Sequence, residues 1–213
     1  MKAPSSPALL IGRQLQFAYG KHSVFSDLNL DIPPGLSVVT GEENSGKTTL
    51  LRLLAAELMP TQGELALHGI HARSHTADYR AQVFWADARS PVWDAMAVPQ
   101  YLKSLGERYP ALQADLLHDL LDALALQDHL DKRFEMLSAG TRRKVFLAAG
   151  FASGAALTLL DTPFAALDKA SIGVLQELLE DAAQHATRAW VLADYEVPDV
   201  AGFAQHLVLP YPA

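Results

Sequence analysis

Short apolar runs alternate with helical periodicities along most of the chain, which is typical of an α/β fold. A continuous apolar run at 36–40, LSVVT, predicts a buried strand, and a glycine-rich turn separates it from a predicted helix over about 47–57. Two short strands are predicted on its N-terminal side, in LQFAYGKHSVFSDLNLDIPPG, with turns at the YGK and PPG segments. The other predicted elements are the strands GELALHG, AQVFWAD, ALTLLD, AWVLAD and HLVLP and the helix SIGVLQELLEDAAQH.

The middle of the chain has a different pattern, which is helical from Val98 to Ala149. Its clearest part is ALQADLLHDLLDALAL, in which the spacing of the leucines predicts an apolar helix face that packs against a core. These leucines are Leu112, Leu116, Leu117, Leu120, Leu121 and Leu124. A helical segment is therefore expected to interrupt the α/β core.

The length of 213 residues, with half of them hydrophobic, fits one domain of good size. We expect a single unit over 8–213, with a core formed by 8–88 and 150–210 and a helical subdomain at 89–149. The absence of cysteine excludes disulfides and thiolate metal sites. The net charge of −7 argues against a nucleic-acid partner, which would favour a basic surface.

The chain shows no targeting pattern. Its first residues, MKAPSSPALLIG, have one lysine and too short an apolar stretch for a signal peptide. No apolar run approaches the roughly 18 to 20 residues that cross a bilayer. We therefore expect a cytoplasmic protein whose contact with a membrane would be made through a partner.

The segment GEENSGKT, residues 41–48, fits the pattern G-x-x-x-x-G-K-[ST] between a predicted strand and a predicted helix. In such a loop the backbone N–H groups point at phosphate oxygens, and the helix N-terminus adds partial positive charge. Lys47 would reach the β and γ phosphates of a nucleotide, and the Thr48 hydroxyl would be a ligand of Mg²⁺. The predicted phosphate-binding residues are Gly41, Asn44, Ser45, Gly46, Lys47, Thr48 and Thr49.

A second motif, MLSAGTRRKVFLAAG at 136–150, makes the chain resemble the ATP-binding cassette (ABC) ATPases. Their signature L-S-G-G-Q reads here LSAGT, from Leu137 to Thr141, at the start of a predicted helix. The resemblance implies a P-loop NTPase core with an antiparallel β subdomain and an inserted α-helical subdomain. It also implies that Ser138 and Gly140 face the γ-phosphate of ATP held by a second subunit.

Further positions match the same family. LTLLD resembles the Walker B strand, which makes Asp161 the carboxylate on the magnesium side and a catalytic residue together with Lys47. FAALD resembles the following loop, whose Asp168 would help to link two subunits. Tyr19 matches an aromatic residue that stacks on adenine, and a tyrosine of the core is the alternative. The N-K-x-D motif by which GTPases recognise guanine is absent. The short length of the chain and its LSAG and PFAALD segments are similar to those of small haem-exporter cassettes.

Three positions depart from the family, and all three belong to hydrolysis. Thr162 stands where a glutamate would polarise the attacking water, and a threonine hydroxyl is no appreciable base near neutral pH. Asp194 stands where a histidine would contact the γ-phosphate, and Asp87 where a glutamine would lie near Mg²⁺. Either Asp87 or Glu196 could substitute as the base. The pattern predicts a site that binds Mg·ATP and hydrolyses it slowly.

Three histidines fall close together in a predicted strand-end loop: His68, His71 and His75. Their spacing lacks a carboxylate or thiolate frame, so an ordinary loop is expected rather than a metal site. A basic cluster opens the signature helix: Arg142, Arg143 and Lys144. It is interpreted as a solvated face, with contact to a partner's nucleotide or loop as the alternative.

The resemblance implies an ATP-binding subunit of an ABC transporter, peripheral on the inner face of the cell membrane, where it would dock on separate membrane-spanning subunits. ATP would close two cassettes head to tail, as a homodimer or as a heterodimer with a second, competent cassette. The alternative is an ATP-binding regulatory or assembly module that is not coupled to transport. A translation or DNA-repair cassette fits poorly, because this chain has neither two cassettes nor a long coiled coil.

Overall fold

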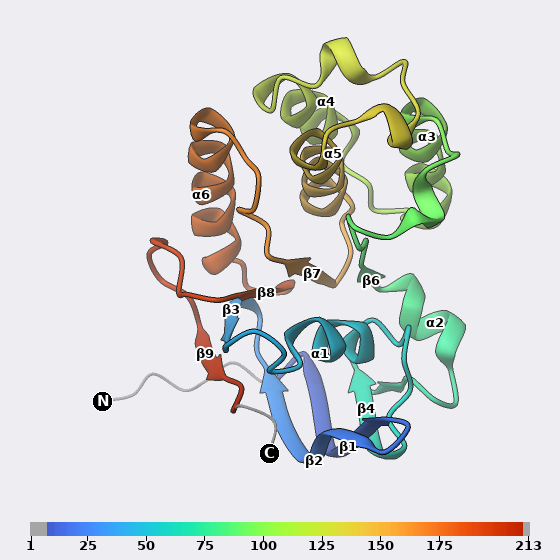
Figure 1. The fold of residues 1–213 in the computed structure, drawn as a ribbon, viewed down its shortest axis with the longest axis vertical. Helices are drawn as coiled ribbons and strands as arrows, with labels where there is room; N and C mark the ends of the chain where they lie inside the picture. Colours follow the sequence, from blue (N-terminus) through green and yellow to red (C-terminus); the bar gives the residue numbers. More distant parts are fainter. Residues whose placement is uncertain (1–7, 211–213) are drawn as a thin grey trace.

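The computed structural model describes residues 8–210 and contains two β-sheets (Figure 1). The first sheet is antiparallel, with strand order β2-β1-β4-β5. Its strands are β1 (Leu10–Tyr19), β2 (His22–Ile32), β4 (Gln62–Leu67) and β5 (Ile70–His71). The predicted turn at YGK closes the β1–β2 hairpin, because Tyr19 pairs with His22 across Gly20 and Lys21.

The second sheet is parallel, with strand order β6-β7-β8-β3-β9. Its strands are β3 (Gly35–Thr40), β6 (Val83–Phe84), β7 (Leu157–Asp161), β8 (Ala189–Asp194) and β9 (Gln205–Val208). The central strands are continuous apolar runs because both faces of this sheet are covered. Alternate residues of β8 enter different cores, Val191 on one face and Leu192 on the other.

Helices cover the parallel sheet. Helix α1 (Lys47–Leu54) contacts β7 and β8, and α6 (Lys169–Ala183) contacts β3 and β8. Leu51 and Leu54 of α1 belong to the core shared with the antiparallel sheet, whereas Leu175 and Leu179 of α6 belong to the core shared with the helical lobe. The predicted α/β fold is confirmed.

The helical lobe comprises α3 (Val98–Arg108), α4 (Ala114–Ala123) and α5 (Ala139–Ala152), with single 3-10 turns at Pro91–Trp93, Gln127–His129 and Phe134–Met136. It lies at the opposite end of the molecule from the antiparallel sheet (Figure 1). The predicted leucine face of α4 packs as expected: four of its leucines are buried, and Leu112 and Leu116 pack partly buried against the same core.

Several predicted bounds were wrong. Helix α1 ends at Leu54 rather than near residue 57, because Ala56 has a left-handed backbone with φ of 52°. The strand predicted to end near Asp87 stops at Phe84, because only Val83 and Phe84 pair with β7. Strand β5 and helix α2 (Thr76–Ala81) were not predicted. None of the helices between residues 8 and 210 combines the length and apolar character needed to span a bilayer.

Candidate functional site

The loop at 41–46 joins β3 to α1 and is shaped by its glycines. A Cβ on Gly41 would lie 2.4 Å from Ser45 Oγ and 3.1 Å from the carbonyl oxygen of Leu209, so a larger residue there would force Ser45 to move. Gly46 has φ of +92°, and a Cβ on it would lie 2.8 Å from Val24 Cγ1. No side chain in the described part of the chain caps α1, so its first N–H groups face the loop without a side-chain acceptor.

Lys47, the first residue of α1, folds back over this loop. Its Nζ donates hydrogen bonds to the carbonyl oxygens of Gly41 at 2.6 Å and Glu42 at 2.7 Å. The same Nζ lies 4.3 Å from the ring centroid of Tyr195, which is a cation–π distance. Burial lowers the pKa of Lys47 below its ordinary value, and the charges of Asp161 and Asp194 oppose that shift.

Thr48 and Asp161 come from different elements and meet at the head of α1. The Thr48 hydroxyl donates to Asp161 Oδ2 at 2.8 Å, and the Asp161 side chain is only 7% exposed at the end of β7. This pair was expected from two separate motifs. The parallel strands β3 and β7 end at the same edge of the sheet, so the loop at 41–46, the N-terminus of α1 and Asp161 lie close together.

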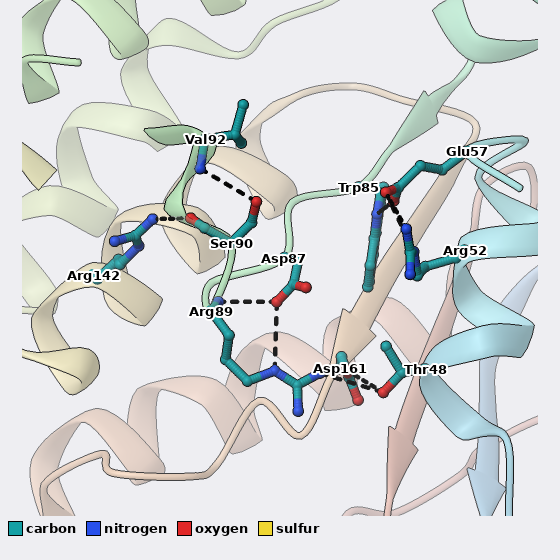
Figure 2. A network of polar contacts seen from close by, with 10 residues as sticks. All are labelled: Thr48, Arg52, Glu57, Trp85, Asp87, Arg89, Ser90, Val92, Arg142 and Asp161. Carbon is teal, nitrogen blue, oxygen red and sulfur yellow. Dashed lines mark hydrogen bonds and ion pairs between the residues drawn. The ribbon is translucent and has the colours of Figure 1, made fainter. Parts of the chain in front are cut away.

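Arg89 is the residue of this site that sequence reasoning missed. Its Nη2 donates to Asp161 Oδ2 at 2.5 Å and lies 3.3 Å from Thr48 Oγ1 (Figure 2). Asp87 holds the arginine, because its Oδ1 accepts from the Arg89 backbone N–H at 2.9 Å and lies 3.5 Å from Arg89 Nε. The signal available in the sequence was an arginine two residues after the substituted position Asp87.

Thr162 follows Asp161 with a left-handed backbone, at φ of 44°. This conformation is unfavourable for a β-branched residue, and the Thr162 N–H donates to the carbonyl oxygen of Ala193 at 2.8 Å. The Thr162 side chain lines the cleft beside Asp161. The position at which the family carries its water-polarising carboxylate is therefore inside the site and occupied by a hydroxyl.

Asp194 and Glu196 lie outside the cleft that contains Thr48 and Asp161. Both line a neighbouring cavity that also includes Phe164 and Gln176, whereas Tyr195 borders this cavity and the cleft of the loop. The Asp194 carboxylate accepts from the Tyr195 N–H at 2.8 Å. Burial raises the pKa of Asp194, the charge of Asp161 raises it further, and Lys47 partly opposes both.

The cleft has a volume of about 590 Å³, which is the size range of small-molecule sites. Its walls include Tyr19, the residues from Glu43 to Thr49, Arg89, Asp161 and Tyr195. Tyr19 is 46% exposed at the rim and packs edge-on against Phe17, with ring centroids 4.9 Å apart. It is therefore not a core residue, and its ring is free to contact a ligand.

Ser138 and Gly140 do not line this cleft and belong to the helical lobe. Ser138 caps α5, because its Oγ accepts from the Thr141 N–H at 3.0 Å. Gly140 lies against the loop before α6, where a Cβ would be 2.3 Å from the carbonyl oxygen of Ala166. Asp168 caps α6 and accepts from the Ser171 N–H at 2.9 Å.

Comparison with known proteins agrees with this geometry. The family model described as ABC transporter matches residues 25–165. The chain belongs to the ABC transporter family. It is 32% identical over 179 residues to the cytochrome c biogenesis ATP-binding export protein CcmA of Nitrosomonas europaea, covering 83% of this chain and 84% of that protein. It is 30% identical over 198 residues to the taurine import ATP-binding protein TauB of Pseudomonas entomophila, covering 92% and 76%.

Solved structures of ABC proteins share the fold. A putative ABC transporter ATP-binding protein from Pyrococcus furiosus matches with a TM-score of 0.73 and 26% identity, covering 94% of this chain and 96% of that one. The ATP-binding subunit of another ABC transporter matches with a TM-score of 0.77 at 22% identity, which shows the fold alone. The predicted family, including the likeness to haem-exporter cassettes, is confirmed, and the alternative of an uncoupled regulatory module is not favoured.

The interpretation of the basic cluster as a solvated face was wrong for this ABC protein. Arg142 pairs with Asp94 at 2.6 Å, and Arg143 Nη1 donates to the carbonyl oxygen of Ala165 at 2.5 Å. Lys144 forms an ion pair with Asp168. These three side chains are largely buried because α5 packs against the rest of the helical lobe and against the loop that leads to α6.

The three histidines lie in different places: His68 in the turn between β4 and β5, His71 on β5, and His75 directly before α2. His68 Nδ1 lies 3.0 Å from Gln82 Oε1, and His75 Nδ1 lies 2.9 Å from Ser74 Oγ. Within residues 8–210, no three histidine, cysteine or acidic side chains are placed to hold a metal ion together.

The predicted magnesium ligands are of the right chemical type, because Mg²⁺ prefers oxygen donors such as the Thr48 hydroxyl and the Asp161 carboxylate. The Thr48–Asp161 pair therefore has the donor chemistry of a magnesium site, and the exposed Arg89 side chain lies against it. Both oxygens contact the guanidinium of Arg89, which already supplies positive charge at that point.

Proposed function

We propose that this chain is the ATP-binding subunit of a transporter, and that it binds ATP in the cleft between the loop at 41–46, Tyr19 and Asp161. The observation that carries the proposal is the uncapped N-terminus of α1 under a glycine-shaped loop, with Lys47 at its mouth. Such a helix end binds phosphate through its N–H groups and dipole. The exposed ring of Tyr19 would stack on the adenine.

A magnesium ion that accompanies the ATP would be held by the Thr48 hydroxyl and the Asp161 carboxylate, the two groups that Arg89 contacts here. The hydrogen bond from the Thr48 hydroxyl to Asp161 holds these two oxygens next to each other. Lys47 would exchange its two carbonyl acceptors for phosphate oxygens, which form stronger, charge-assisted hydrogen bonds.

We propose that hydrolysis at this site is slow. Thr162 offers no carboxylate beside Asp161, and loss of one well-placed general base costs about 10² to 10⁴ in rate. Asp87 could substitute only by releasing Arg89, to which it is bound through the backbone N–H. Glu196 lines the neighbouring cavity instead of the cleft, which argues against it as the base.

The signature residues support a role in a second cassette. Ser138 and Gly140 lie at a capped helix end in the helical lobe, away from this chain's own cleft, so they would act on a nucleotide held by a partner. In a heterodimer they would complete a competent partner's site, while the chain's own cleft retains ATP. A homodimer would have two slow sites.

We further propose that the dimer docks on separate membrane-spanning subunits at the inner face of the membrane and drives transport. The similarity to export and import ATP-binding proteins supports this assignment. No nucleic-acid partner is proposed, because the net charge is −7.

The test is an ATP-binding titration by calorimetry beside a steady-state ATPase assay on the purified chain. Saturable ATP binding with slow turnover is the expected result. Absence of ATP binding would overturn the function, and rapid turnover by the chain alone would overturn only the slow-site proposal. Adding a competent cassette from the same genome should raise turnover, and Ser138→Ala should reduce that increase.

A further inference from the structure

Tyr195 follows β8 and lies over Lys47, the first residue of α1. The Lys47 Nζ is 4.3 Å from the centroid of the Tyr195 ring, so the ammonium and the ring are in cation–π contact. Tyr195 is 56% exposed and lines the cleft of the loop at 41–46. The ring therefore borders the position at which the Lys47 ammonium would meet a ligand.

The end of β8 brings Tyr195, and not its neighbours, into the cleft. Asp194 pairs with Thr40 at the end of β3, directly before the loop at 41–46. The Asp194 carboxylate accepts the Tyr195 N–H at 2.8 Å and lines the neighbouring cavity. Among residues 194–199, only Tyr195 lines the cleft. The chain therefore places a phenol group in the cleft and keeps the adjacent carboxylates out of it.

Tyr195 stands at the phosphate end of the proposed nucleotide site. Its ring covers the ammonium of Lys47, which is expected to bind the β and γ phosphates. Thr162, on the wall beside which the attacked phosphate would lie, donates its N–H to the carbonyl oxygen of Ala193 at 2.8 Å, two residues before Tyr195. Tyr19, which would stack on the adenine, belongs to β1 of the other sheet. The ligand group that reaches Tyr195 is therefore the terminal phosphate.

The chemistry of this side chain suits a phosphate. An oxygen that accepts a hydrogen bond from Lys47 Nζ lies about 3 Å from that atom, which brings the phosphate against the Tyr195 ring. The phenol O–H is a neutral donor, so it can bind a phosphate oxygen without adding negative charge. Hydrogen bonds to a charged acceptor are stronger than those between neutral groups.

We propose that the Tyr195 hydroxyl donates a hydrogen bond to the terminal phosphate of ATP, which makes Tyr195 a specificity-determining residue that favours ATP over ADP. Without nucleotide the ring covers the Lys47 ammonium. With ATP, Lys47 and Tyr195 bind the same phosphate, whereas ADP lacks that phosphate and leaves the hydroxyl without its acceptor. The inference rests on the proposed ATP site and assigns one further residue within it.

The experiment measures the Kd of ATP and the Kd of ADP, both with magnesium, by calorimetry. Tyr195→Phe keeps the ring over Lys47 and removes only the hydroxyl. It should weaken ATP binding by about tenfold or more, because a hydrogen bond to a charged group is lost, and leave ADP binding unchanged. Tyr19→Phe is the matched control. It changes the same atom at the adenine end, which ATP and ADP share, so the ratio of the two Kd values should stay as in the unmodified chain.

A Tyr195→Phe variant with the same ratio of the two Kd values as the unmodified chain would overturn the inference and leave the ATP site intact. An equal change of that ratio in Tyr19→Phe would also overturn it, since the effect would not then belong to Tyr195. Failure of the unmodified chain to bind either nucleotide would instead overturn the proposed function, and this inference with it. The affinity of Tyr195→Phe for ADP reports whether its site is still folded.

Discussion

Gly140 of α5 lies in backbone contact with Ala166, so close that a Cβ on Gly140 would be 2.3 Å from the Ala166 carbonyl oxygen. Two further contacts run between the same segments, from Arg143 to the carbonyl oxygen of Ala165 and from Lys144 to Asp168. The signature helix and the loop before α6 are therefore one packed unit within the chain.

Gly140→Ala should destabilise the protein, because the added methyl group meets backbone rather than a flexible side chain. Overpacking of this kind costs about 1–3 kcal/mol in the free energy of unfolding. Urea unfolding followed by circular dichroism measures the change.

The matched control is Gly173→Ala, in the interior of α6, where an added Cβ meets nothing within 4 Å. That substitution should stabilise the protein by about 0.5–1 kcal/mol, since alanine is the better helix former. Equal effects of the two substitutions would show that the contact with Ala166 is not tight.

Thr162→Glu should raise the ATPase rate of the isolated chain. The new carboxylate would stand directly after Asp161, on the wall of the cleft, where it can act as a general base. The expected gain in kcat is about 10² to 10⁴, measured by phosphate release at saturating ATP.

Thr162→Gln is the control for this gain, because it has the size of glutamate and no basic oxygen. It should leave kcat unchanged. If Thr162→Glu also leaves kcat unchanged, the substitutions at Asp87 and Asp194 limit hydrolysis as strongly as the missing glutamate.

Lys47→Ala should weaken ATP binding by about 10-fold to 100-fold, because it removes charge-assisted hydrogen bonds to the phosphates. The unliganded protein should remain folded, since the Lys47 Nζ contacts in it are to loop carbonyls. Calorimetry gives the affinity. Lys103→Ala, on an exposed position of α3, is the control and should bind ATP normally.

The ion pair of Lys144 with Asp168 should make stability depend on acid pH. Lys144 and the Ser171 N–H hold the pKa of Asp168 well below the ordinary value of 3.8. The stabilisation is therefore complete above the unfolded-state pKa and is lost as the pH falls through the lower folded-state pKa. Asp168→Asn should be less stable than the unmodified chain at neutral pH, and the difference should shrink only in strong acid.

Asparagine also caps helices well, so this variant removes charge and retains the cap. Urea midpoints measured from neutral pH downward give the difference. Asp119→Asn, an exposed residue of α4 with no ion pair in the described chain, is the control. A difference for Asp168→Asn that stays constant into strong acid would contradict the electrostatic origin.

The sequence alone was sufficient for the family and for the order of the main elements. Continuous apolar runs such as LSVVT and LTLLD belong to strands that are buried on both faces, so these strands can be predicted from the sequence. The GEENSGKT loop can also be predicted, because it has glycine at defined points. The leucine face of α4 was equally predictable, because the periodicity of a helix is a local property of the sequence.

Short strands and side-chain contacts between distant segments could not be predicted from the sequence. Strand β6 ends at Phe84 because the chain leaves β7 there, although β7 continues to Asp161, and the sequence of AQVFWAD does not contain that information. The basic cluster looked solvated because its partners, Asp94, Ala165 and Asp168, lie far away in the chain.

The same distinction applies to the site. The sequence by itself determined that a phosphate-binding loop, Asp161 and a hydroxyl at Thr162 occur in one chain. Only the tertiary structure decided that Arg89 contacts Thr48 and Asp161, since these residues belong to three separate segments. The physical reason is that local spacing specifies loops and helix faces, whereas the meeting of charges depends on how the sheet and the helical lobe pack together.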